Sequence, residues 1–151
     1  MATLVGNEGL FIDTLKNLIE LDYDAIAAYQ AAIDRIDDPQ TRTQLTQFKG
    51  DHERHTRELG EIVRELGETP PTEGDFKAYL TKGKVIIGNL TGDSGILKAM
   101  KSNEDDTNAA YERALARTDV SPFRAKEILE RNLADERRHR AWIEQRLGQL
   151  G

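Results

Sequence analysis

Apolar residues recur every three or four positions near the start of the chain. From about Glu8 to Ile36 they are Leu15, Leu18, Ile19, Ala25, Ile26, Tyr29 and Ile33. This is the period of one face of an amphipathic α-helix, so the pattern predicts a long first helix. Asp38 and Pro39 then supply an N-cap and a proline suited to the first position of a second helix. The short joint makes the two helices antiparallel neighbours.

The second helix is predicted to end at Gly67 and to be followed by a long connection. Its apolar face consists of Leu45, Phe48, Leu59, Ile62 and Leu66. Residues 68–93 then contain Pro70 and Pro71 and an apolar stretch interrupted by Gly83 and Gly88. The apolar members of that stretch are Phe76, Tyr79, Leu80, Val85, Ile86 and Ile87. We predict a crossover that carries a short helix.

Two more helices follow the crossover. Asp93 or Ser94 can cap the third, and Ser121 with Pro122 repeats the pattern of a cap and a proline before the fourth. Their apolar faces contain Leu97, Met100, Tyr111 and Leu115, and Leu129, Leu133, Ile143 and Leu147. Two hairpins joined by one long crossover is the connectivity of ferritin-like bundles. We therefore predict an all-α, ferritin-like four-helix bundle forming a single domain over residues 1–151, with hairpins at about 8–67 and 94–150 and a crossover at 68–93.

Ionisable residues interrupt the apolar faces in a pattern that repeats between the two halves. Asp22 lies seven residues before Tyr29 on the apolar row of the first helix, and Glu104 lies seven before Tyr111 on that of the third. Each hairpin is thus predicted to begin with a carboxylate that faces the core.

The second helix of each hairpin carries two candidate ligands one turn apart. Glu136 and His139 share an i, i+3 relation, and so do His52 and His55. All three histidines of the chain belong to these two pairs. Because the spacings agree between the halves, a pseudo-twofold axis is predicted to bring all six candidates to one level of the bundle.

Carboxylates that face an apolar core each cost several kcal/mol unless they are protonated, paired or bound to a cation. Taken singly, each candidate is better explained as part of a solvated run of charges or as the partner of a nearby arginine. Their joint placement on inward rows in both halves favours a buried metal site, since one divalent ion resolves the conflict for several carboxylates together.

At these residues the chain resembles the ferritin-like superfamily, in which helices supply Glu and Glu-x-x-His ligands to a di-iron or di-manganese centre. It looks most like a bacterial family of small stand-alone ferritin-like proteins of unknown function, which carry runs similar to Asp24-Ala25-Ile26-Ala27-Ala28-Tyr29 and Asp51-His52-Glu53-Arg54-His55. The similarity to rubrerythrin and bacterioferritin is more distant and confined to the motif.

The resemblance implies roles for individual residues. Asp22 and Glu104 match the terminal carboxylates, His55 and His139 the imidazole ligands, and Glu136 one bridging carboxylate. The chain departs from the pattern at His52, where ferritins and rubrerythrins have a second bridging Glu. Two alternatives stay open there, since His52 can itself be a ligand or Asp51 can replace it by pairing with His55.

Composition narrows the classes of function. The chain is 38% hydrophobic and 32% charged, as expected of one soluble domain, and has neither a long apolar run nor a signal peptide, so we expect a cytoplasmic protein without a membrane partner. A net charge of −6 without a basic patch argues against nucleic acid as a partner. The absence of cysteine excludes disulfides, thiolate zinc sites and iron–sulfur clusters.

The sequence therefore predicts a protein that binds one or two ions of iron, or of manganese or zinc, with oxidation of ferrous iron or reduction of oxygen or peroxide as its reaction if it is an enzyme. The alternative is a non-catalytic bundle, acting in stress or interaction, whose site is empty or holds one ion. A homo-oligomer such as a dimer is compatible with either, whereas an iron-storage cage has no support in the sequence.

Overall fold

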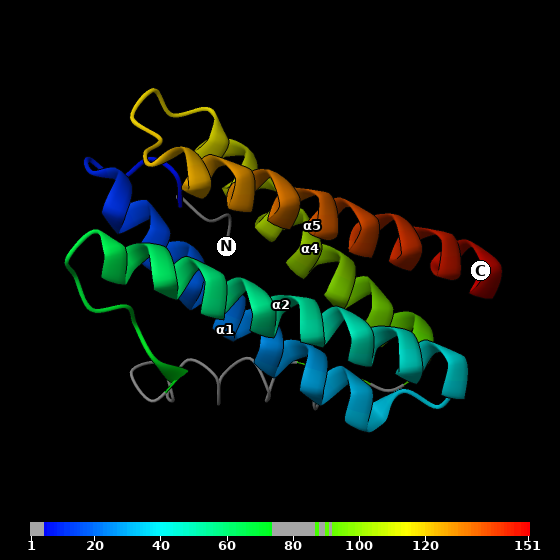
Figure 1. Ribbon diagram of the computed structural model, residues 1–151. Coiled ribbons are helices and arrows are strands. Elements are labelled where there is room, and N and C mark those ends of the chain that lie inside the picture. Colours follow the sequence, from blue (N-terminus) through cyan, green and yellow to red (C-terminus); the bar gives the residue numbers. More distant parts are fainter. Residues whose placement is uncertain (1–4, 74–86, 88–89, 91) are drawn as a thin grey trace.

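The computed structural model describes residues 5–73, 87, 90 and 92–151, and in these residues the chain is helical, without a strand. The four long helices are α1 (Phe11–Arg35), α2 (Pro39–Glu65), α4 (Asp93–Leu115) and α5 (Phe123–Leu150). They form a four-helix bundle (Figure 1), which confirms the predicted all-α class. Most of the short helix predicted in the crossover, including Phe76, Tyr79, Leu80, Val85 and Ile86, lies outside the described residues.

The helices pair as two antiparallel hairpins. α1 packs most extensively on α2 and α4 on α5, and the hairpins meet through α1 with α4 and α2 with α5. The start of α1 lies among the end of α2, the end of α4 and the start of α5. The turns of the two hairpins are therefore at opposite ends of the bundle (Figure 1), as a pseudo-twofold axis across its middle requires.

The predicted start of α2 is confirmed. Pro39 is its first residue, and the Asp38 carboxylate accepts a hydrogen bond from the Thr41 backbone N–H at 2.9 Å, as an N-cap does. Gly67 lies just beyond the helix with a φ of 87°, a conformation that glycine adopts without a steric penalty.

The predicted starts of the other helices were less accurate. α1 begins at Phe11 rather than near Glu8, whose carboxylate instead accepts a hydrogen bond from the Gly6 N–H at 2.7 Å. α4 has Gly92 at its cap position, and the Asp93 carboxylate accepts hydrogen bonds from the backbone N–H groups of Asp37 and Asp38 at 2.9 and 3.1 Å. Asp93 thus ties α4 to the turn of the first hairpin instead of capping its own helix.

The prediction for α5 was also wrong in detail. Pro122 itself occupies the cap position, without a side-chain capping hydrogen bond, and α5 begins at Phe123. The proline therefore stands one place earlier than predicted, just outside the helix.

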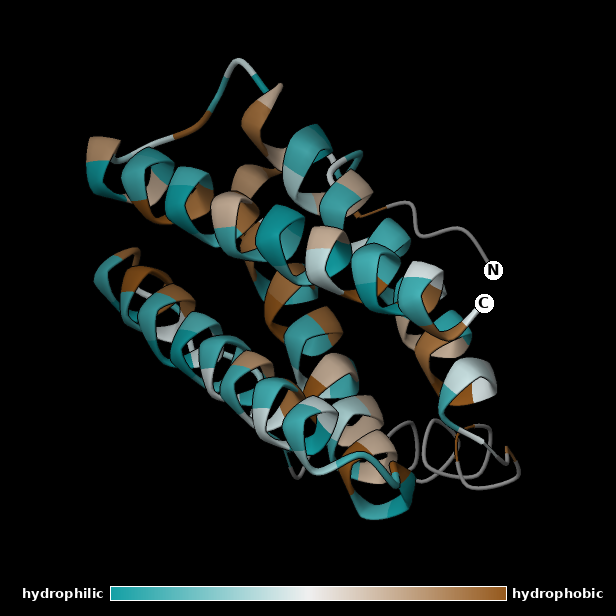
Figure 2. Ribbon diagram, turned by 90° about the vertical axis from the view of Figure 1, so that its right-hand side faces the viewer, coloured by the Kyte–Doolittle hydropathy of each residue, from teal (hydrophilic) through white to brown (hydrophobic). Residues whose placement is uncertain are grey.

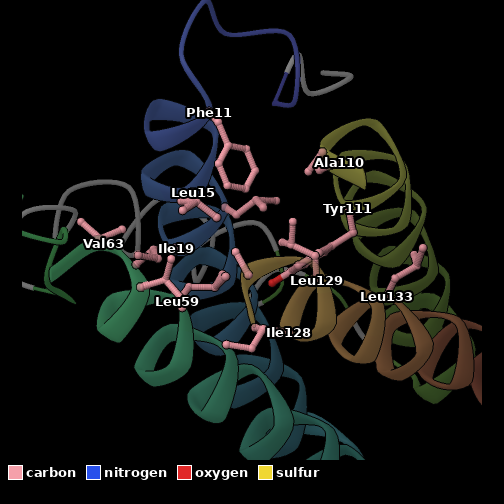
Figure 3. Packing of buried hydrophobic residues seen from close by; sticks show 14 residues of the cluster. Phe11, Leu15, Ile19, Leu59, Val63, Ala110, Tyr111, Ile128, Leu129 and Leu133 are labelled. Carbon is pink, nitrogen blue, oxygen red and sulfur yellow. The ribbon is translucent and has the colours of Figure 1, made fainter. Parts of the chain in front are cut away.

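The core consists of two apolar clusters, one toward each end of the bundle. The first cluster, shown in Figure 3, includes Phe11, Leu15, Ile19, Leu59, Ile62, Tyr111 and Leu129. The second includes Tyr29, Leu45, Phe48, Ile96, Met100 and Ile143. Apolar residues line the inner sides of the helices while their outer sides are mainly hydrophilic (Figure 2). Within the described part of the chain, none of the helices has an apolar stretch that could cross a bilayer.

Candidate metal centre

A layer of buried polar side chains separates the two apolar clusters. Its members are the six residues predicted as ligands: Asp22 on α1, His52 and His55 on α2, Glu104 on α4, and Glu136 and His139 on α5. Asp22 is 1% exposed and the other five are 0% exposed. The structure thus brings side chains from all four helices to one level, as the helical spacing predicted.

These six residues form two overlapping groups whose candidate ligand atoms lie within 4.8 Å of one another. We name as site 1 the group of Asp22, His52, His55 and Glu136, and as site 2 the group of His52, Glu104, Glu136 and His139. His52 and Glu136 belong to both sites. They occupy equivalent places in the two halves of the pseudo-twofold repeat.

Site 1 has the spacing of a small coordination sphere. Asp22 Oδ1 lies 2.7 Å from Nδ1 of His52 and 3.1 Å from Nδ1 of His55. Each of these two nitrogens lies 3.4 Å from Glu136 Oε1. Tetrahedral ligands at 2.0–2.1 Å from a zinc ion are separated by about 3.3 Å. The contacts to Glu136 match this separation, whereas those to Asp22 are hydrogen bonds and are shorter.

Site 2 is built in the same way and is slightly wider. Glu104 Oε1 lies 3.5 Å from His52 Nε2 and 3.4 Å from His139 Nδ1. Glu136 contributes its other oxygen, because Oε2 lies 3.9 Å from His139 Nδ1. Nitrogen and oxygen ligands of this kind suit iron, manganese or zinc.

Three polar atoms in this layer have no hydrogen-bond partner: His52 Nε2, His139 Nδ1 and Glu136 Oε1. An unsatisfied buried polar group costs about 1–3 kcal/mol, and more if it is charged. His52 Nε2 and His139 Nδ1 face site 2, and Glu136 Oε1 faces site 1. A cation in each site would satisfy all three, so the donor set fits a metal.

Two aspartates accept hydrogen bonds from the outer nitrogens of His55 and His139. Nε2–H of His55 donates to Asp135 across the helix interface at 2.9 Å, and Nε2–H of His139 donates to Asp51 at 2.8 Å. This arrangement turns Nδ1 of each ring inward, as carboxylates do for metal-bound histidines in general. Asp51 thus contacts His139. The alternative in which Asp51 replaces His52 by pairing with His55 is not what the structure shows, and Asp51 belongs to neither site.

Asp135 was not among the residues predicted from the sequence, although a signal for it was present. Asp51 stands four residues before His55, and Asp135 stands four before His139. Each aspartate thus supports the histidine of the opposite helix. This pairing of each aspartate with the histidine of the opposite helix can be recognised only once α2 and α5 are known to be neighbours.

Hydroxyl groups orient the carboxylates. Tyr111 OH donates to Asp22 Oδ2 at 2.7 Å, and Tyr29 OH donates to Glu104 in the equivalent contact of the other half. The Thr107 hydroxyl donates to Glu136 Oε2 at 2.8 Å. The two tyrosines thus fill core and also hold one carboxylate of each site in place.

The charges in this layer are balanced without a metal. Burial opposes the charged form of Asp22, but the charge of His55 and the hydrogen bonds from both histidines of α2 lower its pKa to about 2. Burial likewise opposes charge on His55, but the charge of Asp22 and the hydrogen bond to Asp135 raise its pKa to about 10. Burial, reinforced by the charge of Glu104, raises the pKa of Glu136 to about 7. Protons and a metal would therefore compete for the same atoms.

Arginines cover the layer on the side where α2 meets α5. Arg138 donates to Asp51 at 2.7 Å and to Asp135 at 3.1 Å, and Arg54 also pairs with Asp135. Burial opposes the charge of Asp135, but the hydrogen bonds from His55 and Arg138 keep its pKa well below the usual range. Both aspartates thus stay ionised as acceptors for the histidines.

Comparison with known proteins adds the family. A family model described as a domain of unknown function (DUF2383) matches residues 11–117, more than half of the chain. The chain belongs to the DUF2383 family. Within the DUF2383 match lie Asp22, His52, His55 and Glu104, whereas Glu136 and His139 on α5 follow it. No curated protein and no solved structure gives a significant match.

Proposed function

We propose that this DUF2383 protein is a ferritin-like metal-binding protein that holds one or two divalent ions between its four helices. The observation that carries the proposal is the pair of buried sites with ligand-like spacing, into which three unpartnered polar atoms point. Asp22 and His55 would serve site 1, Glu104 and His139 would serve site 2, and His52 and Glu136 would serve both. The position of these residues on four antiparallel helices supports the relation to the ferritin-like superfamily.

The physiological metal is proposed to be iron or manganese. Zinc fits the same ligands and binds more tightly than either by the Irving–Williams order, so zinc recovered with the protein would not identify the natural ion. The absence of cysteine leaves only nitrogen and oxygen ligands, which all three metals accept.

The proposed reaction class is oxidation of ferrous iron or reduction of oxygen or peroxide. A bound redox-active ion would supply the electron exchange. The protein would supply a dry site between two apolar clusters, with Tyr29 and Tyr111 holding the carboxylates and Asp51 and Asp135 holding the imidazoles. A cytoplasmic location, a single domain and assembly into a dimer stay predictions from the sequence.

A non-catalytic bundle is the second candidate function, and the charge balance of the polar layer favours it. Three histidines face three carboxylates, and the raised pKa of His55 and lowered pKa of Asp22 describe ion pairs that stabilise the layer without a metal. Such a bundle would fold and act in stress or interaction with an empty site or one structural ion.

Oxygen consumption on addition of ferrous iron separates the two candidates. If the site is catalytic, the wild-type protein should consume oxygen and the Glu136→Ala, His139→Ala double variant should not. Glu130→Ala is a suitable control because Glu130 lies on the same helix with a side chain 58% exposed, and it should keep the wild-type rate. A wild-type protein that binds iron but consumes no oxygen would contradict the oxidase function and favour the second candidate.

A further inference from the structure

His52 lies at the centre of the polar layer and presents a different ring nitrogen to each site. Its Nδ1 is 2.7 Å from Asp22 Oδ1 and 3.4 Å from Glu136 Oε1, which belong to site 1. Its Nε2 is 3.5 Å from Glu104 Oε1, which belongs to site 2, and has no hydrogen-bond partner. The ring is fully buried.

The other two histidines are arranged differently. His55 and His139 each use Nε2 to donate to an aspartate, Asp135 and Asp51 respectively, and so each has one nitrogen left for a metal. His52 has no such outer carboxylate on Nε2, because that atom faces Glu104 inside the layer. Of the three histidines in the chain, His52 is thus the one whose two nitrogens both face candidate ligand groups, Nδ1 toward Asp22 and Nε2 toward Glu104.

We propose that His52 bridges two metal ions as an imidazolate, with Nδ1 bound to the ion of site 1 and Nε2 to the ion of site 2. This inference rests on the proposed metal-binding function and specifies how the two sites are joined. Each ion that binds a ring nitrogen displaces the proton that this nitrogen carries, and the displaced protons pass to solvent. Glu136 also lies between the sites, since its Oε1 faces site 1 and its Oε2 faces site 2.

The bridge sets the distance between the ions. With metal–nitrogen bonds of 2.0–2.1 Å on opposite sides of the ring, two ions joined by an imidazolate lie about 6 Å apart. Two-metal sites joined by carboxylate or hydroxide have their ions about 3.5–4 Å apart. The metal–metal separation therefore distinguishes the two kinds of bridge.

Zinc is a suitable probe because it binds nitrogen and oxygen ligands without redox chemistry. We would load the full chain with zinc alone, measure zinc per chain, and locate the ions by anomalous scattering in crystals. The expected result is two zinc ions about 6 Å apart with the ring of His52 between them. His52→Glu, which restores a carboxylate bridge, should bring the two ions to about 3.5–4 Å.

Binding measurements on single variants give an independent test. His52→Gln should weaken both zinc ions, each by more than the roughly 10–100-fold typical of losing an outer partner. His55→Gln and His139→Gln are matched controls, each buried and each removing a ligand from one site, so each should weaken one ion and spare the other. Circular dichroism should show the helical content of all three unchanged.

Two zinc ions about 3.5–4 Å apart in the wild-type protein would overturn the proposed imidazolate bridge. Two ions that are both bound without His52 would do the same. One zinc per chain would also overturn the bridge while leaving the proposed metal-binding function intact. No zinc bound to wild type would overturn the proposed function itself, and the bridge with it.

Discussion

The carboxylate of Asp135 on α5 accepts a hydrogen bond from Nε2–H of His55 on α2 at 2.9 Å. This contact crosses between the hairpins and directs Nδ1 of His55 toward Asp22 and Glu136. The equivalent contact of the other half joins Asp51 to His139 at 2.8 Å. The orientation of the candidate ligands thus depends on residues outside the two sites.

Asp135→Asn should weaken the ion in site 1 by roughly 10–100-fold, because the amide is a poorer acceptor and no longer fixes the tautomer of His55. Titration with manganese measures the effect. Asp51→Asn is the matched variant and should weaken the ion in site 2 instead. Equal affinities in wild type and both variants would show that these aspartates do not support the ligands.

The stability of the metal-free protein should fall as the pH rises from about 5 to 10. The pKa of His55 is raised from 6.5 to about 10, so its contribution is present below pH 6.5 and is lost as the pH rises through 10. The pKa of Glu136 is raised from 4.5 to about 7, and its contribution is lost as the pH rises through 7. Asp22, with a pKa lowered from 3.8 to about 2, adds a loss only below pH 3.8.

Thermal unfolding of chelator-treated protein measures this dependence. Excess manganese should raise the Tm more at pH 8 than at pH 6, because the metal needs the deprotonated ligands. His55→Gln should flatten the fall in Tm at high pH. A metal-free Tm that rises between pH 6 and 9 would contradict the assigned ion pairs.

Tyr111→Phe should lower the free energy of unfolding by about 1.5–3 kcal/mol, the usual contribution of a hydrogen bond to a charged group. The variant leaves Asp22 Oδ2 without the hydroxyl that donates to it at 2.7 Å and keeps the ring in the first apolar cluster. Urea denaturation of the metal-free protein is the measurement. Tyr23→Phe, at a partly buried position beside the same cluster, should change the value little; an equal loss in both variants would count against the contact.

Asp38→Ala should destabilise the protein by about 0.5–2 kcal/mol through loss of the α2 cap. The Asp38 carboxylate accepts from both the backbone N–H and the hydroxyl of Thr41, at 2.9 and 2.7 Å. Asp37→Ala is the control, since the adjacent Asp37 is exposed and its backbone N–H contact with Asp93 survives the change. Unfolding at the same urea concentration in wild type and Asp38→Ala would refute the capping role.

The features that follow from helical period alone were predictable from the sequence. Rows of apolar residues indicated four helices, and Asp22 and Glu104 were placed in the core because each continues such a row at a rigid spacing. The level at which the candidate ligands meet followed from the repeat between the halves. The geometry of a helix depends on residues close together in the chain, so the sequence alone is sufficient to predict which residues share a face.

Contacts between helices were not predictable in the same way. Asp93 is a residue type favoured at an N-cap, but its carboxylate accepts hydrogen bonds from backbone N–H groups of the other hairpin. Asp51 and Asp135 lie on the flank of their helices, and the helical period does not determine which adjacent helix a residue in that position contacts. Their roles depend on how α2 and α5 are paired, which only the tertiary structure shows.

The most direct test of the central claim is metal content per chain, measured by elemental analysis of protein purified without chelator and again after reloading with ferrous iron or manganese. The account predicts one or two ions per chain in wild type and their loss in the Glu136→Ala, His55→Ala double variant, with helical content unchanged. No ion in wild type after reloading, or equal metal in the folded double variant, would contradict it.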